Sequence, residues 1–407
     1  MDDENPSANE IWTIGGSPEG TEGEEDLNAE SLQRVTQAVV SSTDWTAETI
    51  LRQLERGNIK LNPSFQRRDA WRPPGKSRFI ESLILGLPIP QLVLAEDKRQ
   101  KGSYIVIDGK QRLLTLRQFS SEKGDPQYSQ LRLRGLEIRK DLNGKSLRDL
   151  EADPSFSEEV SAFQNQTIRT VVIRAWPNED FLYLIFLRLN TGSVRLSAQE
   201  LRQALHPGDF VQYVDETSGR LPGLRKIFNS SEPDFRMRDA ELLVRYFAFR
   251  NFLPAYRGNL KQWLDETCEV LNQAWATRKD ELEQQTDDLQ SAIDATYKIF
   301  GQKDAFRKWE GTRYERPFNR AVFDIMVFYF SQAAIRRRAE SSHIQVQSDF
   351  KKLCSSDSGF MESLTATTKS LDATGYRLST WGRVLRRRLN KPFAIVELVE
   401  NTLTLVQ

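Results

Sequence analysis

The sequence is poor in histidine and cysteine. Its 407 residues include two histidines, His206 and His343, and two cysteines, Cys268 and Cys354. So few imidazoles and thiols argue against zinc clusters, HNH-type nuclease sites and most histidine-based catalytic triads. Two cysteines so far apart also exclude a disulfide framework and favour a reducing cytoplasm.

Long apolar runs are missing as well. No stretch approaches the roughly 18 residues that a membrane-spanning helix needs, and the first residues lack the basic-then-apolar pattern of a signal peptide. Hydrophobic residues make up 39% of the chain and charged residues 28%, which is typical of a protein with a conventional core and surface. We therefore expect a cytoplasmic protein of two or three domains.

Basic residues are absent from residues 1–30, which contain ten acidic side chains. The rest of the chain carries 57 basic and 47 acidic side chains, a net charge of +10. Residues 1–30 have too little apolar surface to offset the entropy of ordering, so we predict a disordered acidic tail. Two interpretations stay open, a solubilising tail or a nucleic-acid mimic that shields a basic groove.

Residues 31–205 mix short strands with helices. The predicted strands are short apolar runs, at Leu92–Leu94, Tyr104–Ile107 and Thr170–Ile173. The predicted helices have apolar residues on one face, at Thr46–Arg56, Lys76–Leu85, Leu113–Phe119 and Phe181–Leu189. Ser197 and Glu200 have the spacing of a capping box that opens a further helix. This pattern predicts an α+β domain with a small sheet.

Residues 206–407 show mainly helical spacing of apolar residues. The long helical candidates are Asp239–Phe252, Leu260–Trp275, Leu282–Phe300 and Asn319–Arg338. We predict an all-α C-terminal domain. Two arginine triplets, residues 336–338 and 386–388, lie on predicted helices and are interpreted either as solvated faces or as phosphate contacts on a nucleic acid.

The most informative segment is a polar turn between a buried strand and an apolar helix. Gly109 allows a positive φ or a close backbone approach, so the amides after it would face outward at a helix N-terminus that attracts anions. Lys110 and Arg112 add positive charge there, and Gln111 offers a donor and an acceptor. Asp108 could hold a divalent ion, orient a water or pair with an arginine. The plainer interpretation is an Asp-Gly turn followed by a solvated basic first turn.

Two further segments suit phosphate or nucleotide binding. Residues 63–72 combine Gln66, Arg67 and further arginines with aromatic residues, although an Arg–Asp surface pair beside a core Trp71 explains them equally well. Residues 186–197 interrupt a helix with a Gly-containing polar loop that includes Asn190 and Thr191. A plain helix–loop–helix is the alternative there.

Together these segments resemble the N-terminal domain of GmrSD-type restriction enzymes, a branch of the ParB/sulfiredoxin-like fold. The matching motifs occur in the family's order over about residues 45 to 205. They are Gln66-Arg67 before Trp71, Gly86-Leu87-Pro88-Ile89-Pro90, Asp108-Gly109-Lys110-Gln111-Arg112, Leu189-Asn190-Thr191-Gly192 and Leu196-Ser197. Lys110 stands where the family usually has glutamine.

The resemblance implies a ParB/sulfiredoxin-like nucleotide-binding domain at residues 31–205 and a helical domain at residues 206–407. The residues that would contact a nucleoside triphosphate are Gln66, Arg67, Gly109, Lys110, Gln111, Arg112, Asn190 and Thr191. Asp108 and Arg112 are the catalytic candidates for hydrolysis, and Asp108 would hold Mg²⁺. The expected function is DNA-directed, in defence against foreign DNA.

Alternatives in other functional classes stay open. The chain could be a non-catalytic DNA-binding or protein-binding module. It could also be a direct metal-dependent nuclease that uses Asp97, Asp108 and Lys110. Full-length family members add a C-terminal HNH nuclease, which we expect to be absent here, so DNA cleavage would need a partner nuclease. Residues 70–77 match a loose Walker A pattern, but Pro73 and Pro74 have no N–H for phosphate.

Overall fold

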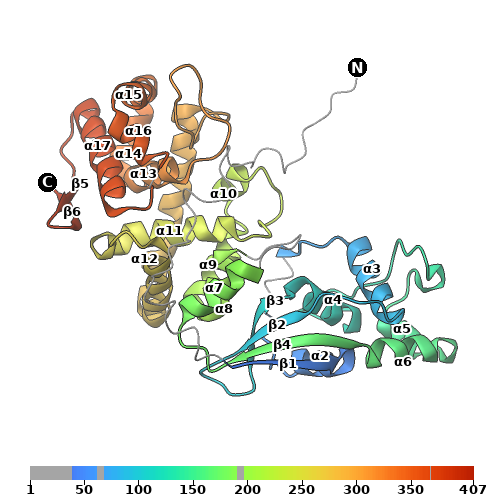
Figure 1. Ribbon diagram of the computed structural model, residues 1–407. Coiled ribbons are helices and arrows are strands. Elements are labelled where there is room, and N and C mark those ends of the chain that lie inside the picture. Colours follow the sequence, from blue (N-terminus) through green and yellow to red (C-terminus); the bar gives the residue numbers. More distant parts are fainter. Residues whose placement is uncertain (1–38, 62–67, 190–196, 367) are drawn as a thin grey trace, which may run out of the picture. The chain divides into compact units, whose positions relative to one another are not determined.

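The computed structural model describes residues 39–61, 68–189, 197–366 and 368–407 (Figure 1). The predicted acidic tail and four of the candidate residues, Gln66, Arg67, Asn190 and Thr191, lie outside these ranges.

The described chain forms two compact units. The sheet unit comprises residues 39–205 together with the short segment 232–238, and the helical unit comprises residues 206–231 and 239–407. The boundary at residue 205/206 falls directly after the last helix of the sheet unit.

The sheet unit is built on a four-stranded mixed sheet with the order β1-β4-β2-β3. The strands are β1 (Val39–Thr46), β2 (Leu92–Glu96), β3 (Tyr104–Asp108) and β4 (Thr167–Arg174). β1 and β3 pair antiparallel with β4 and β2 respectively, and β2 runs parallel to β4. The α+β prediction and its three strands are confirmed. β1 was not predicted, because this edge strand is largely exposed and polar and so lacks an apolar alternation.

Helices cover both faces of this sheet. They are α2 (Ala47–Glu55), α3 (Pro73–Ile84), α4 (Lys110–Ser120), α5 (Leu147–Glu151), α6 (Ser157–Asn165), α7 (Glu179–Leu189) and α8 (Ala198–Leu205), with short 3₁₀ turns at Lys140–Leu142 and Pro154–Phe156. Alternate residues of β2 and β3 belong to different cores. Leu94 and Val106 pack with the helices α2 to α6, whereas Ala95 and Ile105 pack with α7 and α8. The sheet is therefore the middle layer of its unit.

The helical unit contains α-helices of very different lengths. They are α9 (Asp209–Ser218), α10 (Pro222–Ile227), α11 (Arg238–Phe252), α12 (Leu260–Phe300), α13 (Arg320–Phe330), α14 (Ala333–Ser341), α15 (His343–Ser356), α16 (Ser358–Ser363) and α17 (Leu371–Leu389), with a 3₁₀ turn at Leu253–Ala255. A hairpin of β5 (Ile395–Val399) and β6 (Thr402–Val406) follows them. This hairpin was not foreseen. None of the described helices has the length and apolarity to cross a lipid bilayer.

Two helix boundaries in this unit differ from the predictions. α12 is one helix of 41 residues, whereas a break was predicted between Trp275 and Leu282. That stretch lacks large apolar residues, but ion pairs of Arg278 with Glu281 and of Lys279 with Glu283 join helix-forming side chains along it. Conversely, the single helix predicted at Asn319–Arg338 is two helices, α13 and α14.

Three arginines of the two triplets have structural partners on their own unit. Arg336 donates to the carbonyls of Phe330 and Ser331 at the end of α13, and Arg338 donates to the Leu389 carbonyl at the end of α17 (2.9 Å). Cationic side chains stabilise helix C-termini in this way. Arg388 pairs with the Asp349 carboxylate. These three arginines therefore hold helices of the unit in place.

Candidate functional site

The predicted turn is formed where β3 passes directly into α4. Gly109 is the residue before the helix and has φ +99°, a conformation that L-residues rarely adopt. A β-carbon at this position would lie 2.3 Å from Leu92 Cδ2 and 3.2 Å from Arg112 Nε. Glycine is therefore the residue that lets the strand turn into the helix here without backbone strain, as the sequence predicted.

The N-terminus of α4 presents backbone amides. Gly109 has no side chain to cap the helix, and among the described residues the N–H groups of Gln111 and Arg112 have no acceptor. The first hydrogen bond of the helix runs from the Leu113 amide to the Gly109 carbonyl (3.0 Å). Unpaired amides at the positive end of a helix dipole are a ready site for an anion.

Two side chains of the turn add polar groups to this terminus. Arg112 Nη2 donates to Asp108 Oδ2 at 2.7 Å. Of the roles predicted for Asp108, the structure thus shows the pairing with an arginine. Asp108 keeps 43% of its side-chain surface exposed, against 11% for Arg112. Within the described part of the chain, the buried atoms Gln111 Oε1 and Arg112 Nε have no hydrogen-bond partner. Buried polar atoms without partners are rare, and a water, an ion or a ligand can satisfy them.

Lys110 points away from solvent. Its side chain is 4% exposed, and its ammonium pairs with Glu200 Oε1 across 90 residues of sequence. The other Glu200 oxygen accepts from the Ser197 amide (2.7 Å), and Ser197 Oγ accepts from the Glu200 amide, which confirms the predicted capping box. Lys110 thus joins the turn to the start of α8. Sequence reasoning missed Glu200 in this role, because its partner is distant in sequence.

The segment that begins at Arg68 is anchored within the sheet unit. Arg68 is buried and donates to the Asp234 carbonyl at 2.6 Å. Trp71 packs edge-on against Phe79 at 5.7 Å between ring centroids, as the core interpretation predicted. Asp69, however, pairs with Lys76.

The Walker A pattern has no structural basis. The ammonium of Lys76 is buried and bound by the Asp69 carboxylate and the Gln118 side-chain carbonyl. Pro73 and Pro74 form the first turn of α3, where a missing N–H costs nothing. Lys76 is therefore a buried structural cation.

The carboxylate–carboxylate–lysine set is not assembled. In the β2–β3 hairpin Asp97 lies beside Ser103, whereas Asp108 pairs with Val93 at the other end. Four residues of extended strand separate the two ends by about 13 Å. Burial raises the pKa of Asp97, but its hydrogen bond from Lys60 (2.6 Å) and the Arg99 amide outweigh burial and lower that pKa below 3.8. Asp97 is a partner of Lys60.

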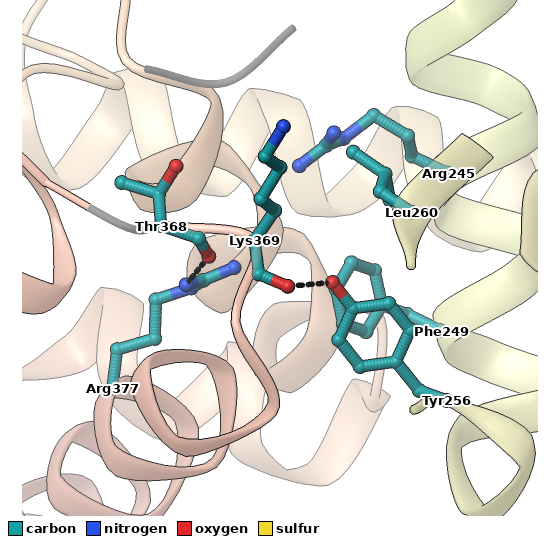
Figure 2. A pocket seen from close by; sticks show the side chains of 7 residues that line it. All are labelled: Arg245, Phe249, Tyr256, Leu260, Thr368, Lys369 and Arg377. Carbon is teal, nitrogen blue, oxygen red and sulfur yellow. Dashed lines mark hydrogen bonds between the residues drawn. The ribbon is translucent and has the colours of Figure 1, made fainter. Parts of the chain in front are cut away.

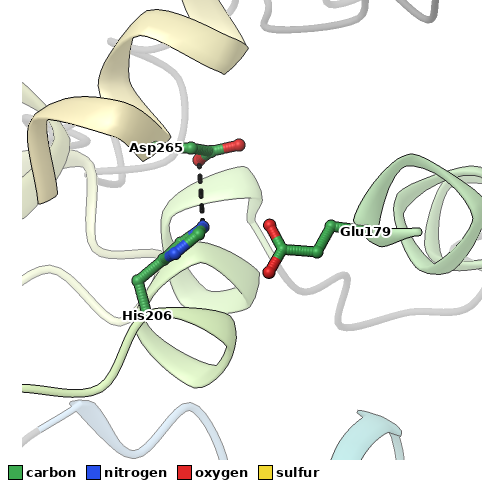
Figure 3. Close-up of side chains that lie close together, drawn as sticks. All are labelled: Glu179, His206 and Asp265. Atoms are coloured by element: carbon green, nitrogen blue, oxygen red, sulfur yellow. Dashed lines mark ion pairs between the residues drawn. The ribbon is translucent and has the colours of Figure 1, made fainter. Parts of the chain in front are cut away.

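Both histidines were set aside as catalytic candidates, and one of them is buried. His206 Nε2 lies 4.0 Å from Asp265 Oδ1 in the helical unit (Figure 3). Asp265 also binds the ammonium of Lys261 at 2.8 Å. The pair links the chain just before α9 to the first turns of α12.

The chain matches no curated protein. Residues 48–207 match the family model described as GmrSD restriction endonuclease, N-terminal domain. The match covers the sheet unit from α2 to the residues after α8 and includes the turn at Asp108–Arg112. The similarity to this family is therefore shown for residues 48–207, which form most of the sheet unit.

Proposed function

We propose that the sheet unit binds a nucleoside triphosphate at the N-terminus of α4 and that the chain is a DNA-directed component of restriction. The observation that carries the proposal is the pair of acceptor-free amides at Gln111 and Arg112 beside a guanidinium. The match to a restriction endonuclease domain supports the DNA-directed, defensive role.

The electrostatics of the turn favour a phosphate group. An anion at a helix N-terminus gains about 0.3 to 1 kcal/mol from the dipole, and up to about 2 kcal/mol where the site is partly buried. The Arg112 guanidinium is nearly buried, and it can bind two phosphate oxygens with parallel N–H groups. Its contact with Asp108 would then be exchanged for, or shared with, the phosphate.

Asp108 and Gln111 are the groups that could act beyond binding. The half-exposed Asp108 carboxylate fits Mg²⁺, which proteins commonly hold through one or two carboxylates together with substrate phosphates. The buried Gln111 carbonyl oxygen could orient a water or accept from the ligand. Lys110 supplies positive charge close to the turn, but its ammonium is engaged by Glu200. Gln66, Arg67, Asn190 and Thr191 remain proposed contacts.

Nucleotide binding by full-length wild-type protein and the Arg112→Ala variant tests the proposal. Thermal stability is measured with ATP, GTP, CTP and UTP, each with magnesium, and each protein is compared with its own nucleotide-free sample. At 100 times the dissociation constant, a bound nucleotide adds about 2.7 kcal/mol to the stability of the folded state. We expect Arg112→Ala to lose this gain and Arg112→Lys to keep part of it.

The matched control is Arg148→Ala, which removes an exposed arginine on α5 whose ion pairs with described residues, Glu122 and Glu151, lie at the surface. It should respond to nucleotide like the wild type. The absence of stabilisation by all four nucleotides in the folded wild type would reject the proposal. Where binding occurs, Asp108→Asn should retain it and lose phosphate release, which distinguishes hydrolysis from binding alone.

A non-catalytic DNA-binding module is the second candidate. The contact between Arg112 and Asp108 favours it, because this ion pair already neutralises the guanidinium. A module of this kind would bind DNA equally well with and without nucleotide. A direct nuclease has less support, since Asp97 lies at the far end of the hairpin from Asp108.

A further inference from the structure

The two arginine triplets include three side chains with no structural role in the helical unit. The other three arginines bind carbonyls or a carboxylate of their own unit, as described above. Within the described residues, three guanidinium groups have neither an ion pair nor a hydrogen-bond acceptor, and they belong to Arg337 of α14 and to Arg386 and Arg387 of α17. Arg337 and Arg387 are exposed, and Arg386 is half-buried. These groups are therefore available to an external partner.

These cations gather where α14 meets the end of α17 (Figure 1). Arg338 of α14 donates to the Leu389 carbonyl of α17 at 2.9 Å. Arg337 precedes this contact in α14, and the last turn of α17 carries the two other arginines. Lys391, two residues beyond α17, adds a half-buried ammonium. We call this surface the basic edge, which consists of Arg337, Arg338, Arg386, Arg387 and Lys391.

The positive charge of the basic edge is not balanced by carboxylates. Acidic side chains on or beside these helices already bind other cations, in the pairs Glu340 with Lys298, Asp349 with Arg388 and Glu397 with Arg383. Within the described residues, no carboxylate pairs with any of the five cations of the basic edge. A helix dipole places about half an elementary negative charge at each C-terminus, so the ends of α14 and α17 offset only about one of these cations.

Buried arginines of the same unit differ from the basic edge, because they have partners inside the protein. Arg245 binds both oxygens of the buried Asp324, with Nε 3.2 Å from Oδ1. Arg377 donates to the Thr368 carbonyl (Figure 2). These two arginines join α11, α13 and α17 within the core. The cations of the basic edge lie at the surface and have no such buried acid.

We propose that the basic edge binds the phosphate backbone of double-stranded DNA without reading its sequence. The inference rests on the DNA-directed role proposed above. Duplex DNA carries about one negative charge per 1.7 Å of its axis, and the planar guanidinium of arginine suits phosphate oxygens. Neither α14 nor the last two turns of α17 contain an aromatic residue. These helix segments therefore offer no ring on which the bases of single-stranded DNA would stack, which favours the duplex.

Fluorescence anisotropy of a labelled mixed-sequence duplex, titrated with the full chain at about 50 to 200 mM salt, tests the inference. The edge variant combines Arg337→Ala, Arg386→Ala and Arg387→Ala. It should fold, because alanine favours helices and no ion pair among the described residues is lost. Each lost phosphate contact lowers the slope of log affinity against log salt by about 0.9, so we expect a slope smaller by about 2 to 3 and an affinity at least about tenfold weaker. Lysine at the same three positions should retain most of the affinity, since these contacts depend on charge.

The matched control variant combines Arg220→Ala, Lys279→Ala and Arg313→Ala. It removes the same number of positive charges from exposed positions on other segments of the helical unit. Its affinity for the duplex and its salt dependence should be close to those of the wild type. Arg112→Ala should also bind the duplex like the wild type, because the proposed nucleotide site lies on α4.

The outcomes separate this inference from the proposed function. If the wild type binds DNA and the edge variant binds it as the control does, the inference fails and the DNA-directed role stands. If the wild type binds no duplex, both fail, whereas nucleotide binding is decided by the thermal stability of Arg112→Ala. Binding of the wild type to phosphatidylserine vesicles without binding to DNA would assign the basic edge to a membrane surface and would overturn the inference.

Discussion

Replacing Gly109 with alanine tests whether the turn requires a residue without a side chain. The left-handed backbone at φ +99° costs an L-residue about 1 to 2 kcal/mol. The added methyl group would also lie 2.3 Å from Leu92 Cδ2, and overpacking of this kind costs about 1 to 3 kcal/mol. We therefore expect Gly109→Ala to lower the free energy of unfolding by about 2 to 5 kcal/mol.

The control is Gly124→Ala in the same unit. Gly124 has φ +90°, and a β-carbon there would meet no atom within 4 Å. Both variants share the backbone strain and the lower entropy of the unfolded chain, so their difference isolates the steric part, about 1 to 3 kcal/mol. Urea denaturation of the full chain, followed by tryptophan fluorescence, measures both. Equal destabilisation of the two variants would refute the close approach of Leu92 to the turn.

Three further predictions follow from buried groups. Lys110→Met should lower the free energy of unfolding by about 3 to 5 kcal/mol in urea denaturation, because it leaves the Glu200 carboxylate buried without its cation. Adding Glu200→Gln should restore part of that loss, and strictly additive effects of the two substitutions would contradict the ion pair. Burial raises the pKa of Glu315 above 4.5 despite the opposing charge of Lys308. The contribution of Glu315 to the stability of the folded state is therefore complete below pH 4.5 and is lost as the pH rises through its folded-state pKa. The free energy of unfolding of the wild type, compared with that of Glu315→Gln, should fall as the pH rises through this range. A difference that does not change with pH would show that the pKa of the Glu315 carboxyl is not raised. Burial also raises the pKa of the Cys354 thiol from 9.0 to about 11. Alkylation of Cys354 in the native protein at pH 8 should therefore be about 100-fold slower than alkylation of an exposed thiol, and equal rates would contradict the burial.

Features that depend on neighbouring residues could be predicted from the sequence. The positive φ of Gly109 follows from an Asp-Gly pair between a strand and a helix, and the capping box of Ser197 and Glu200 follows from their spacing. Both depend on contacts within four residues, so no knowledge of the rest of the fold is needed. Strands β2 and β3 were also predictable, because burial on both faces gives continuous apolar runs.

Helix continuity was not readable from the same patterns. The polar stretch at residues 276–281 looked like a connection because it has no large apolar residue to pack. Helix propensity and ion pairs with a spacing of three or four residues carry α12 through it. The opposite error occurred between α13 and α14, where neither glycine nor proline marks the end at Ser331. There the carbonyls at the end of α13 are bound by Arg336, which lies five residues beyond Ser331.

Pairing across the fold decides which charged residues of the turn can act on a ligand. Asp97 and Asp108 are close in sequence, yet the antiparallel hairpin carries them to opposite ends of β2 and β3. Lys110 and Glu200 are 90 residues apart, yet they form a buried ion pair. Lys110 is therefore a tether between the turn and α8, and its charge is balanced inside the protein. Arg112 lies one helical turn from Asp108 and keeps part of its surface exposed, so it is the cation of the turn to which we assign the phosphate in the proposed site.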